Sequence, residues 1–308
     1  MTLALHGKSK TRQGWLIAIA VAMVAFAALA GSGTLLASES ARAAAPPAPY
    51  LNGFEQAGDA VIDPLYVSNE AMFYVTRVPS GTNGVASASG SWHAQAAQNP
   101  YGTVPFAPFT RYGGYSSVFP AGGYTTSIDI YLDTTASPNG SDIRFDWSSA
   151  ISTTAGAHRR DFIFSVGTNG TGGFVMSAGN NAPGWPANPG NAPFTITTTG
   201  WYTFQHTFRN NGFGVLAVDM RVLSGPTVLN TWTLSDPTDV IGTTVGGNRY
   251  GWLVYNDFPG LALDNITRSG VVPPPTDKDQ CKKDGWMTFN SPSFPDQGTC
   301  VSYVNNHN

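Results

Sequence analysis

The segment Ser127–Trp147 holds the densest group of side chains with chemical potential in this chain. Side chains two positions apart on a strand share one face. If the loop 134–141 joins two paired strands, one polar face of the hairpin carries carboxylates and a guanidinium that can bind sugar hydroxyls or a cation. The alternative is a face that is only solvated, as antiparallel sheets often have. The polar positions that alternate with apolar ones are Asp129, Tyr131, Asp133, Asp142, Arg144 and Asp146.

Catalytic motifs are absent from the sequence. Glycoside hydrolysis requires two carboxylates that flank the scissile bond, yet Glu55 and Glu70 are the only glutamates between residues 44 and 270. Aspartates would have to supply the pair. The sequence contains no G-x-S-x-G or H-E-x-x-H motif, and the glycine-rich loop 167–173 lacks the lysine of a phosphate-binding loop. The enzymatic interpretation therefore rests on aspartates alone.

Aromatic residues lie in two long loops rich in glycine and proline, 99–124 and 180–193. Sugar rings stack their C–H faces on such side chains, and rigid loops often carry binding residues. We expect Tyr112, Tyr115 and Trp185 either to contact a ligand or to fold back into a small core, and the phenylalanines to be buried. With Asp129 and Arg144 these three residues form the predicted binding set.

Residues 50–270 read as short strands separated by glycine, proline and asparagine turns, which predicts an all-β antiparallel sandwich of the jelly-roll, concanavalin-like type. His206 is in phase with Tyr202, Phe204 and Phe208, so we expect it to be packed rather than catalytic. The alternation is clearest in 127–133 and is repeated in 142–147. Further predicted strands are 161–166, 174–177, 194–198, 201–209, 215–223, 228–234, 252–255 and 261–267.

Two short motifs carry a resemblance to known modules. The domain opens with Asn52-Gly53-Phe54-Glu55 and closes with Leu263-Asp264-Asn265-Ile266. This is similar to the first and last strands of carbohydrate-binding-module and lectin-like jelly rolls, which pair with each other. The resemblance implies a structural calcium ion with Glu55 and Asp264 among its ligands, although two carboxylates are only part of a calcium site. The alternative is a surface glutamate and an aspartate that accepts a turn hydrogen bond.

The C-terminal segment, residues 277–308, contains both cysteines of the chain and follows a proline-rich linker, residues 271–276. In an exported protein we expect Cys281 and Cys300 to form a disulfide. The string from Asp279 to Val304 resembles a C-terminal segment that recurs on actinobacterial exported proteins. That resemblance implies export and assigns no activity.

The N-terminus has the order of a secretory signal peptide, residues 1–43. Three basic residues precede the apolar run Trp15–Ala30, and Ala41-Arg42-Ala43 offers small side chains for cleavage. A short spacer, residues 44–49, follows. The alternative is a retained membrane anchor. With cleavage, the sequence predicts a secreted protein without membrane attachment, which can also be associated with the cell wall.

The charge of the domain argues against nucleic acid as a partner. Residues 44–270 contain no lysine, nine arginines and fourteen acidic residues, so this part of the chain has a net negative charge. We therefore expect non-catalytic binding of an extracellular polysaccharide or cell-wall glycan. The alternatives are a structural or surface-associated protein without a small ligand, and a glycan-cleaving enzyme.

Overall fold

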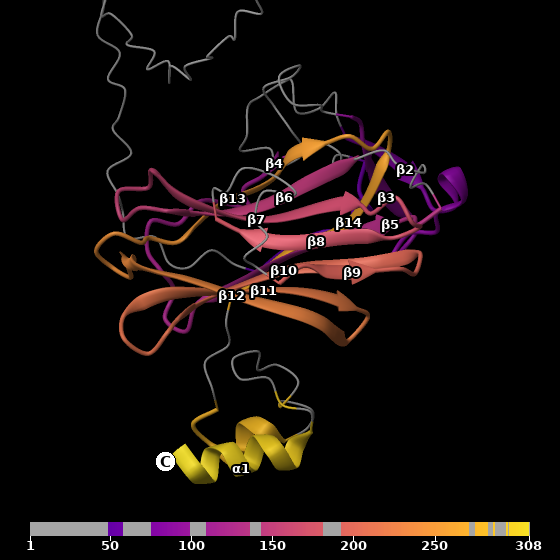
Figure 1. Cartoon of the computed structure of the whole chain (residues 1–308). Helices are drawn as coiled ribbons and strands as arrows, with labels where there is room; N and C mark the ends of the chain where they lie inside the picture. Colours follow the sequence, from indigo (N-terminus) through magenta and orange to yellow (C-terminus); the bar gives the residue numbers. More distant parts are fainter. Residues whose placement is uncertain are drawn as a thin grey trace, which may run out of the picture. The chain divides into compact units, whose positions relative to one another are not determined.

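The computed structural model is built almost entirely from antiparallel strands that form two sheets, as the sequence predicts (Figure 1). Among the described residues, no helix is both long and apolar enough to cross a membrane. The predicted signal peptide lies outside the described part of the chain. The structure describes residues 49–57, 75–98, 109–135, 143–180, 192–270, 275–282, 286, 294 and 296–307.

The larger sheet contains eight strands in the order β12-β11-β10-β5-β14-β3-β2, with β1 paired to β14 beside β3. Its strands are β1 (Tyr50–Asn52), β2 (Val75–Pro79), β3 (Trp92–Ala96), β5 (Tyr124–Leu132), β10 (Gly200–Asn210), β11 (Val215–Ser224), β12 (Thr227–Val240) and β14 (Leu261–Gly270).

The smaller sheet contains six strands in the order β4-β13-β6-β7-β8-β9. Its strands are β4 (Phe109–Thr110), β6 (Arg144–Ser152), β7 (His158–Thr168), β8 (Phe174–Gly179), β9 (Phe194–Ile196) and β13 (Asn248–Asn256).

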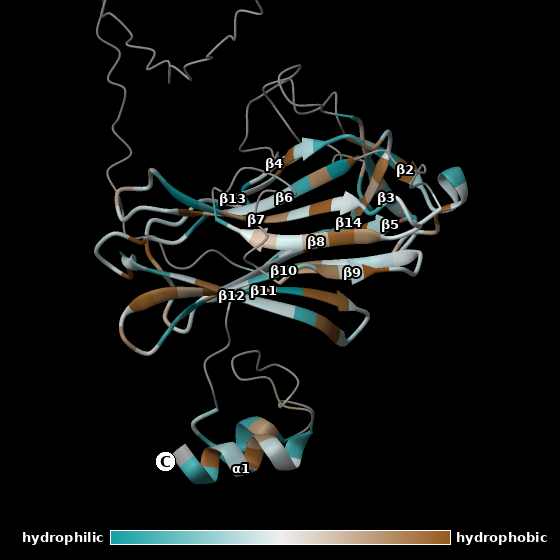
Figure 2. Ribbon diagram, viewed as in Figure 1, coloured by the Kyte–Doolittle hydropathy of each residue, from teal (hydrophilic) through white to brown (hydrophobic). Residues whose placement is uncertain are grey.

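The alternation of apolar residues explains why these segments form strands. Ile128, Ile130 and Leu132 are fully buried on β5, while the residues between them are partly exposed. Figure 2 shows the same alternation of hydrophobic and hydrophilic residues along β6. Each large apolar side chain removed from water contributes about 1.5–3 kcal/mol, so the buried faces hold the sheets together.

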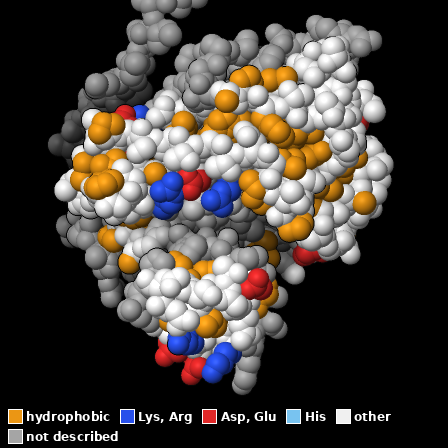
Figure 3. Space-filling model, turned by 60° about the horizontal axis from the view of Figure 1, so that its bottom comes forward, with side chains coloured by type: hydrophobic (Ala, Val, Ile, Leu, Met, Phe, Trp, Pro, Cys, Tyr) orange, Lys and Arg blue, Asp and Glu red, His pale blue; other side chains and the backbone are white. Residues whose placement is uncertain are grey.

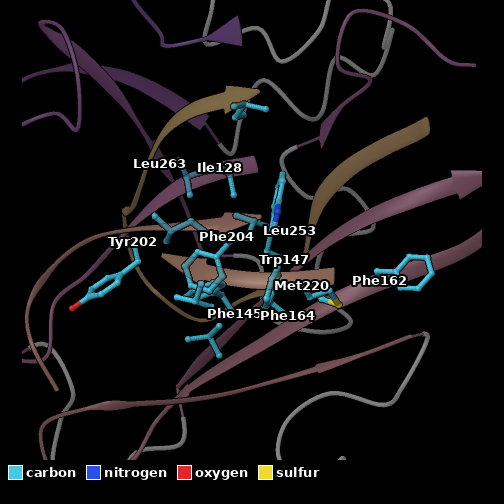
Figure 4. Packing of buried hydrophobic residues seen from close by; sticks show 14 of the residues in the cluster. Ile128, Phe145, Trp147, Phe162, Phe164, Tyr202, Phe204, Met220, Leu253 and Leu263 are labelled. Atoms are coloured by element: carbon cyan, nitrogen blue, oxygen red, sulfur yellow. The ribbon is translucent and has the colours of Figure 1, made fainter. Parts of the chain in front are cut away.

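Aromatic rings dominate the core between the sheets (Figure 4). Phe204 on β10 meets Phe145 on β6 and Phe164 on β7 edge to face, with ring centroids 5.9 and 5.3 Å apart. Such T-shaped pairs are a preferred aromatic geometry. The core therefore links both sheets directly.

His206 on β10 is packed in this core, as the sequence predicts. Its ring is fully buried, and Nε2 lies 3.0 Å from the carbonyl oxygen of Phe162. Burial lowers the pKa of His206 to about 3, because the charged imidazolium is poorly solvated there. The residue is neutral at physiological pH and has a structural role.

The first and last strands of the domain pair with each other, as the resemblance to jelly-roll modules implies. Asn52 in β1 lies opposite Ile266 in β14. Strands β2 and β3 were not predicted, because charged and polar residues such as Arg77 and His93 interrupt their apolar pattern.

The C-terminal segment forms a small unit with its own core. The predicted disulfide is present, with Cys281 and Cys300 joined at 2.02 Å between the Sγ atoms. A short 3-10 helix, η3 (Lys278–Cys281), and the helix α1 (Gln297–His307) supply the two cysteines. The helix was not predicted from its polar sequence. Cys300 and Val304, one turn apart on α1, are its buried residues.

Candidate functional site

The predicted polar patch on one hairpin does not form. β5 pairs with β10 and β14 in the larger sheet, whereas β6 pairs with β13 and β7 in the smaller one. Asp129 and Arg144 therefore lie on different sheets, and the prediction that they share a face is wrong. Alternation shows which side of a strand is apolar, but it does not show which strand lies beside it.

Asp129 has a structural role. Its carboxylate accepts hydrogen bonds from Thr203 Oγ1 at 2.5 Å and from Asn265 Nδ2 at 2.9 Å. Asn265 has a positive φ of 48° at the irregularity in the β14–β5 pairing. Asp129 thus stabilises an unusual backbone conformation, and its oxygens already have protein donors.

Glu55 and Asp264 hold the β2–β3 loop. The Glu55 carboxylate accepts from the backbone N–H groups of Ser91 and Trp92 at 3.0 and 3.1 Å. Asp264 is fully buried and accepts from Ser89 N at 3.2 Å and Asn265 N at 2.8 Å. Both residues therefore act on the same loop.

The hydrogen bonds of Glu55 and Asp264 favour the alternative to a calcium site. Calcium requires six to eight oxygen ligands, whereas the partners of Glu55 and Asp264 are N–H groups. Among the described residues, no group of three or more His, Cys, Asp or Glu side chains is placed to hold a metal ion. The arrangement matches the alternative of a surface glutamate and an aspartate in a turn, and calcium stays an untested prediction.

The β2–β3 loop lies over the polar outer face of the larger sheet. The Trp201 indole N–H donates to Ala86 O at 2.8 Å, and Ser87 Oγ lies 3.0 Å from Nδ1 of the buried His93. Figure 3, turned so that the bottom of the Figure 1 view comes forward, shows hydrophobic side chains scattered among other side chains and a few charged ones. The outer face of the larger sheet is thus partly occupied by the chain's own loop.

The predicted loop aromatics, Tyr112, Tyr115 and Trp185, differ in where they lie. Tyr112 is fully buried with a positive φ of 55°, and its hydroxyl donates to Ser149 Oγ at 3.4 Å. The proposal that it contacts a ligand is therefore wrong, and the alternative of burial holds. Tyr115 is 36% exposed. Trp185 lies outside the described residues.

The outer face of the smaller sheet brings aromatic and charged side chains together. Leu253 lies opposite Trp147 in the core, so Trp252 beside it points to the opposite face, where it lies across from Ser148. We call this surface the β13 face. It is defined by the partly exposed residues Arg144, Asp161, Tyr250, Trp252 and Tyr255.

Asp161 on β7 organises the centre of the β13 face. Its Oδ1 accepts from the Trp252 indole N–H at 3.2 Å and from Ser148 Oγ at 2.9 Å. Its Oδ2 lies 2.8 Å from His158 Nε2. Because three groups converge on one carboxylate, the plane of the Trp252 indole is fixed relative to the sheet.

Aromatic rings and guanidinium groups line both ends of the β13 face. Arg144 lies 4.4 Å from the ring centroid of Tyr255. At the other end, Arg249 lies 5.4 Å from the Tyr250 ring and 5.2 Å from that of Tyr115. Of the predicted binding set, Tyr115 and Arg144 therefore flank this surface, and cation–π contacts orient their neighbours.

A buried carboxyl lies beside Arg144 on the same strand. Asp146 is 4% exposed, and within the described structure its Oδ1 has no hydrogen-bond partner. Burial raises the pKa of Asp146, although Arg144 and a hydrogen bond with Ser165 oppose the shift. The protonated form is therefore more favoured for this buried carboxyl than for the carboxyl of an exposed aspartate.

The sequence contains a signal for the β13 face. Tyr250 and Trp252 alternate at the period of a strand, and Tyr255 follows after an irregularity in the pairing with β6. The segment 252–255 was predicted as a strand, but its neighbours β6 and β4 are distant in sequence. Without those pairings the aromatic row could not be joined to Arg144 and Asp161.

No family model and no curated protein matches the chain. Solved structures with a partly similar fold include an endo-β-1,4-glucuronan lyase from the fungus Trichoderma reesei, with 9% identity, a TM-score of 0.37, and coverage of 64% of this chain and 87% of that one. A PL-14 alginate lyase from Aplysia kurodai has 11% identity and a TM-score of 0.33, over 65% and 88% of the two chains. A basic winged bean lectin has 11% identity and a TM-score of 0.28, over 63% and 84%. Similarity at this level assigns no function.

Proposed function

We propose that this chain is an exported glycan-binding protein that binds an extracellular polysaccharide on the β13 face. The observation that carries the proposal is the row of Tyr250, Trp252 and Tyr255 beside Arg144 on one outer sheet surface. Aromatic rings provide flat apolar surfaces for the C–H faces of sugars. Arginine provides fixed donors for hydroxyl or carboxylate oxygens. A linear chain of sugars can lie along the strand and meet these groups in turn.

The test is binding of the purified protein to insoluble and soluble polysaccharides, both neutral and uronate-containing. We expect Trp252→Ala to raise the dissociation constant at least about tenfold, which is the loss of affinity typical of a central aromatic contact. Phe213→Ala is the matched control, because Phe213 is 90% exposed on the β10–β11 turn and belongs to the other sheet. Equal affinities of the wild type and Trp252→Ala would refute the proposed site.

The same assays distinguish glycan binding from two alternatives, a structural or surface-associated protein and a glycan-cleaving enzyme. If no polysaccharide binds, the structural or surface-associated interpretation is favoured. Asp146 supports a glycan-cleaving enzyme as a second candidate, because a buried carboxyl with a raised pKa is suited to donate a proton to a leaving group. Release of shorter sugars that is abolished in Asp146→Asn would establish that activity.

A further inference from the structure

A cavity of about 250 Å³ lies at one end of the sandwich. Its wall combines the short 3-10 helix η2 (Thr82–Gly84), the end of β5 and the turn between β13 and β14. None of the residues that define the β13 face lines it. The lining residues used below are Asn83, Gln95, Tyr131, Asp133, Phe174 and Phe258.

Among the described residues, the hydrogen bonds of the polar side chains that line this cavity leave some donors and acceptors without a partner. Asp133 Oδ1 accepts from Thr135 N at 2.9 Å and Thr135 Oγ1 at 2.7 Å, which leaves Oδ2 as an acceptor. Gln95 Oε1 accepts from Asn83 Nδ2 at 3.4 Å, which leaves the Gln95 amide hydrogens as donors. The Tyr131 hydroxyl can do both, and its ring is held edge to face against Trp201, with centroids 5.4 Å apart.

The rest of the wall is apolar and rigid. The Phe174 and Phe258 rings have centroids 5.9 Å apart and are both buried. They belong to the cluster that fills the core, so the wall does not need to form when a ligand arrives. An apolar wall with a few convergent polar groups is the usual composition of a small-molecule site.

Size and charge limit the ligand. The volume is slightly below the range of about 300–1,000 Å³ of pockets for drug-sized molecules, so a single ring fits. The Asp133 carboxylate disfavours anionic rings and suits hydroxyl donors. We propose that this cavity binds one neutral sugar ring, through apolar contact with its wall and hydrogen bonds to Tyr131, Asp133 and Gln95.

This site is independent of the β13 face and can hold either a free monosaccharide or the end of a glycan chain. The test titrates the full chain with methyl glycosides of glucose, galactose and mannose, with glucuronic acid as the anionic comparison. Chemical shifts of the amides that line the cavity report binding. A parallel titration with oligosaccharides of the same sugars separates a chain end from a free ring.

Three variants, taken together, are expected to affect the neutral and the anionic sugar differently, which a general loss of folding would not do. Tyr131→Phe removes one hydroxyl and keeps the ring against Trp201, and we expect about tenfold weaker binding of the neutral glycoside. Asp133→Asn keeps an acceptor for Thr135, and it should weaken the neutral glycoside while allowing glucuronic acid to bind. Val85→Trp, at the partly exposed wall, should block both.

Trp252→Ala serves as the control and should leave this binding unchanged, so the outcome does not depend on the polysaccharide proposal. The proposal is overturned if none of the three neutral glycosides shifts the amides of the cavity. It is also overturned if the shifts persist unaltered in Tyr131→Phe and Val85→Trp.

Discussion

The Trp252 indole N–H donates to Asp161 Oδ1 across 3.2 Å, from β13 to β7, over the strand β6 that lies between them. The same oxygen accepts from Ser148 Oγ on β6. One carboxylate therefore ties three adjacent strands on the β13 face. Its effect on a ligand is exerted through the orientation of Trp252, so Asp161 is a positioning residue in the proposed site.

Asp161→Ala should weaken polysaccharide binding about fivefold, less than Trp252→Ala, because loss of one hydrogen bond worth about 1 kcal/mol leaves the indole present but free to turn. Asp161→Asn keeps an acceptor oxygen and should restore most of the affinity. Isothermal titration gives the affinities, and thermal unfolding shows whether the variants stay folded. If Asp161→Asn binds as poorly as Asp161→Ala, the carboxylate charge matters more than its geometry.

The positions of most strands could be predicted from alternation, although those of β2, β3 and β4 could not, and the partners of each strand could not be predicted. Ile128, Ile130 and Leu132 identified β5 and its buried face. The chain crosses from one sheet to the other between β5 and β6, and no periodicity in the sequence reveals such a crossing. Asp129 and Arg144 therefore lie on different sheets. Tyr112 shows a second limit, because a left-handed backbone directs its ring inward from a loop whose composition suggests exposure.

Calcium should have no effect on the stability of the β2–β3 loop. Glu55 and Asp264 already accept backbone N–H groups, and these bonds hold the loop without a cation. We expect the unfolding temperature to be the same in EDTA and in millimolar calcium chloride. A clear rise with calcium that is lost in Glu55→Gln would restore the metal site that the jelly-roll resemblance implies.

The disulfide should stabilise the C-terminal unit and leave the sandwich unchanged, because the two have separate cores. The cysteines are 19 positions apart, and closing a loop of that size contributes about 3 kcal/mol in the chain-entropy model. In the double variant Cys281→Ser, Cys300→Ser, amides of α1 should exchange with solvent much faster. Amides of β7 and β10 serve as the internal control, and faster exchange there would contradict the separation.

His206 should make the fold less stable as the pH falls. Its folded pKa of about 3 lies below its value of about 6.5 in the unfolded chain, so between these values only the unfolded state binds the proton. The stabilisation is complete above pH 6.5 and is lost progressively toward pH 3. His206→Gln removes this titration and can still donate to Phe162 O. The free energy of unfolding of the wild type relative to this variant should therefore decrease from pH 7 to pH 4 in urea titrations.

Asp264 should make the fold more stable as the pH falls, which is opposite to the effect of His206. Burial raises its pKa to about 6, even though the N–H groups of Ser89 and Asn265 favour the carboxylate. The unfolded value is about 3.9, so the folded state binds the proton more tightly, and this stabilisation is complete below pH 4 and lost as the pH rises through 6. Asp264→Asn cannot accept both N–H groups, so it should be less stable than the wild type throughout. Its deficit in the free energy of unfolding should shrink between pH 4 and pH 7, and a constant deficit would show that Asp264 stays ionised in the folded protein.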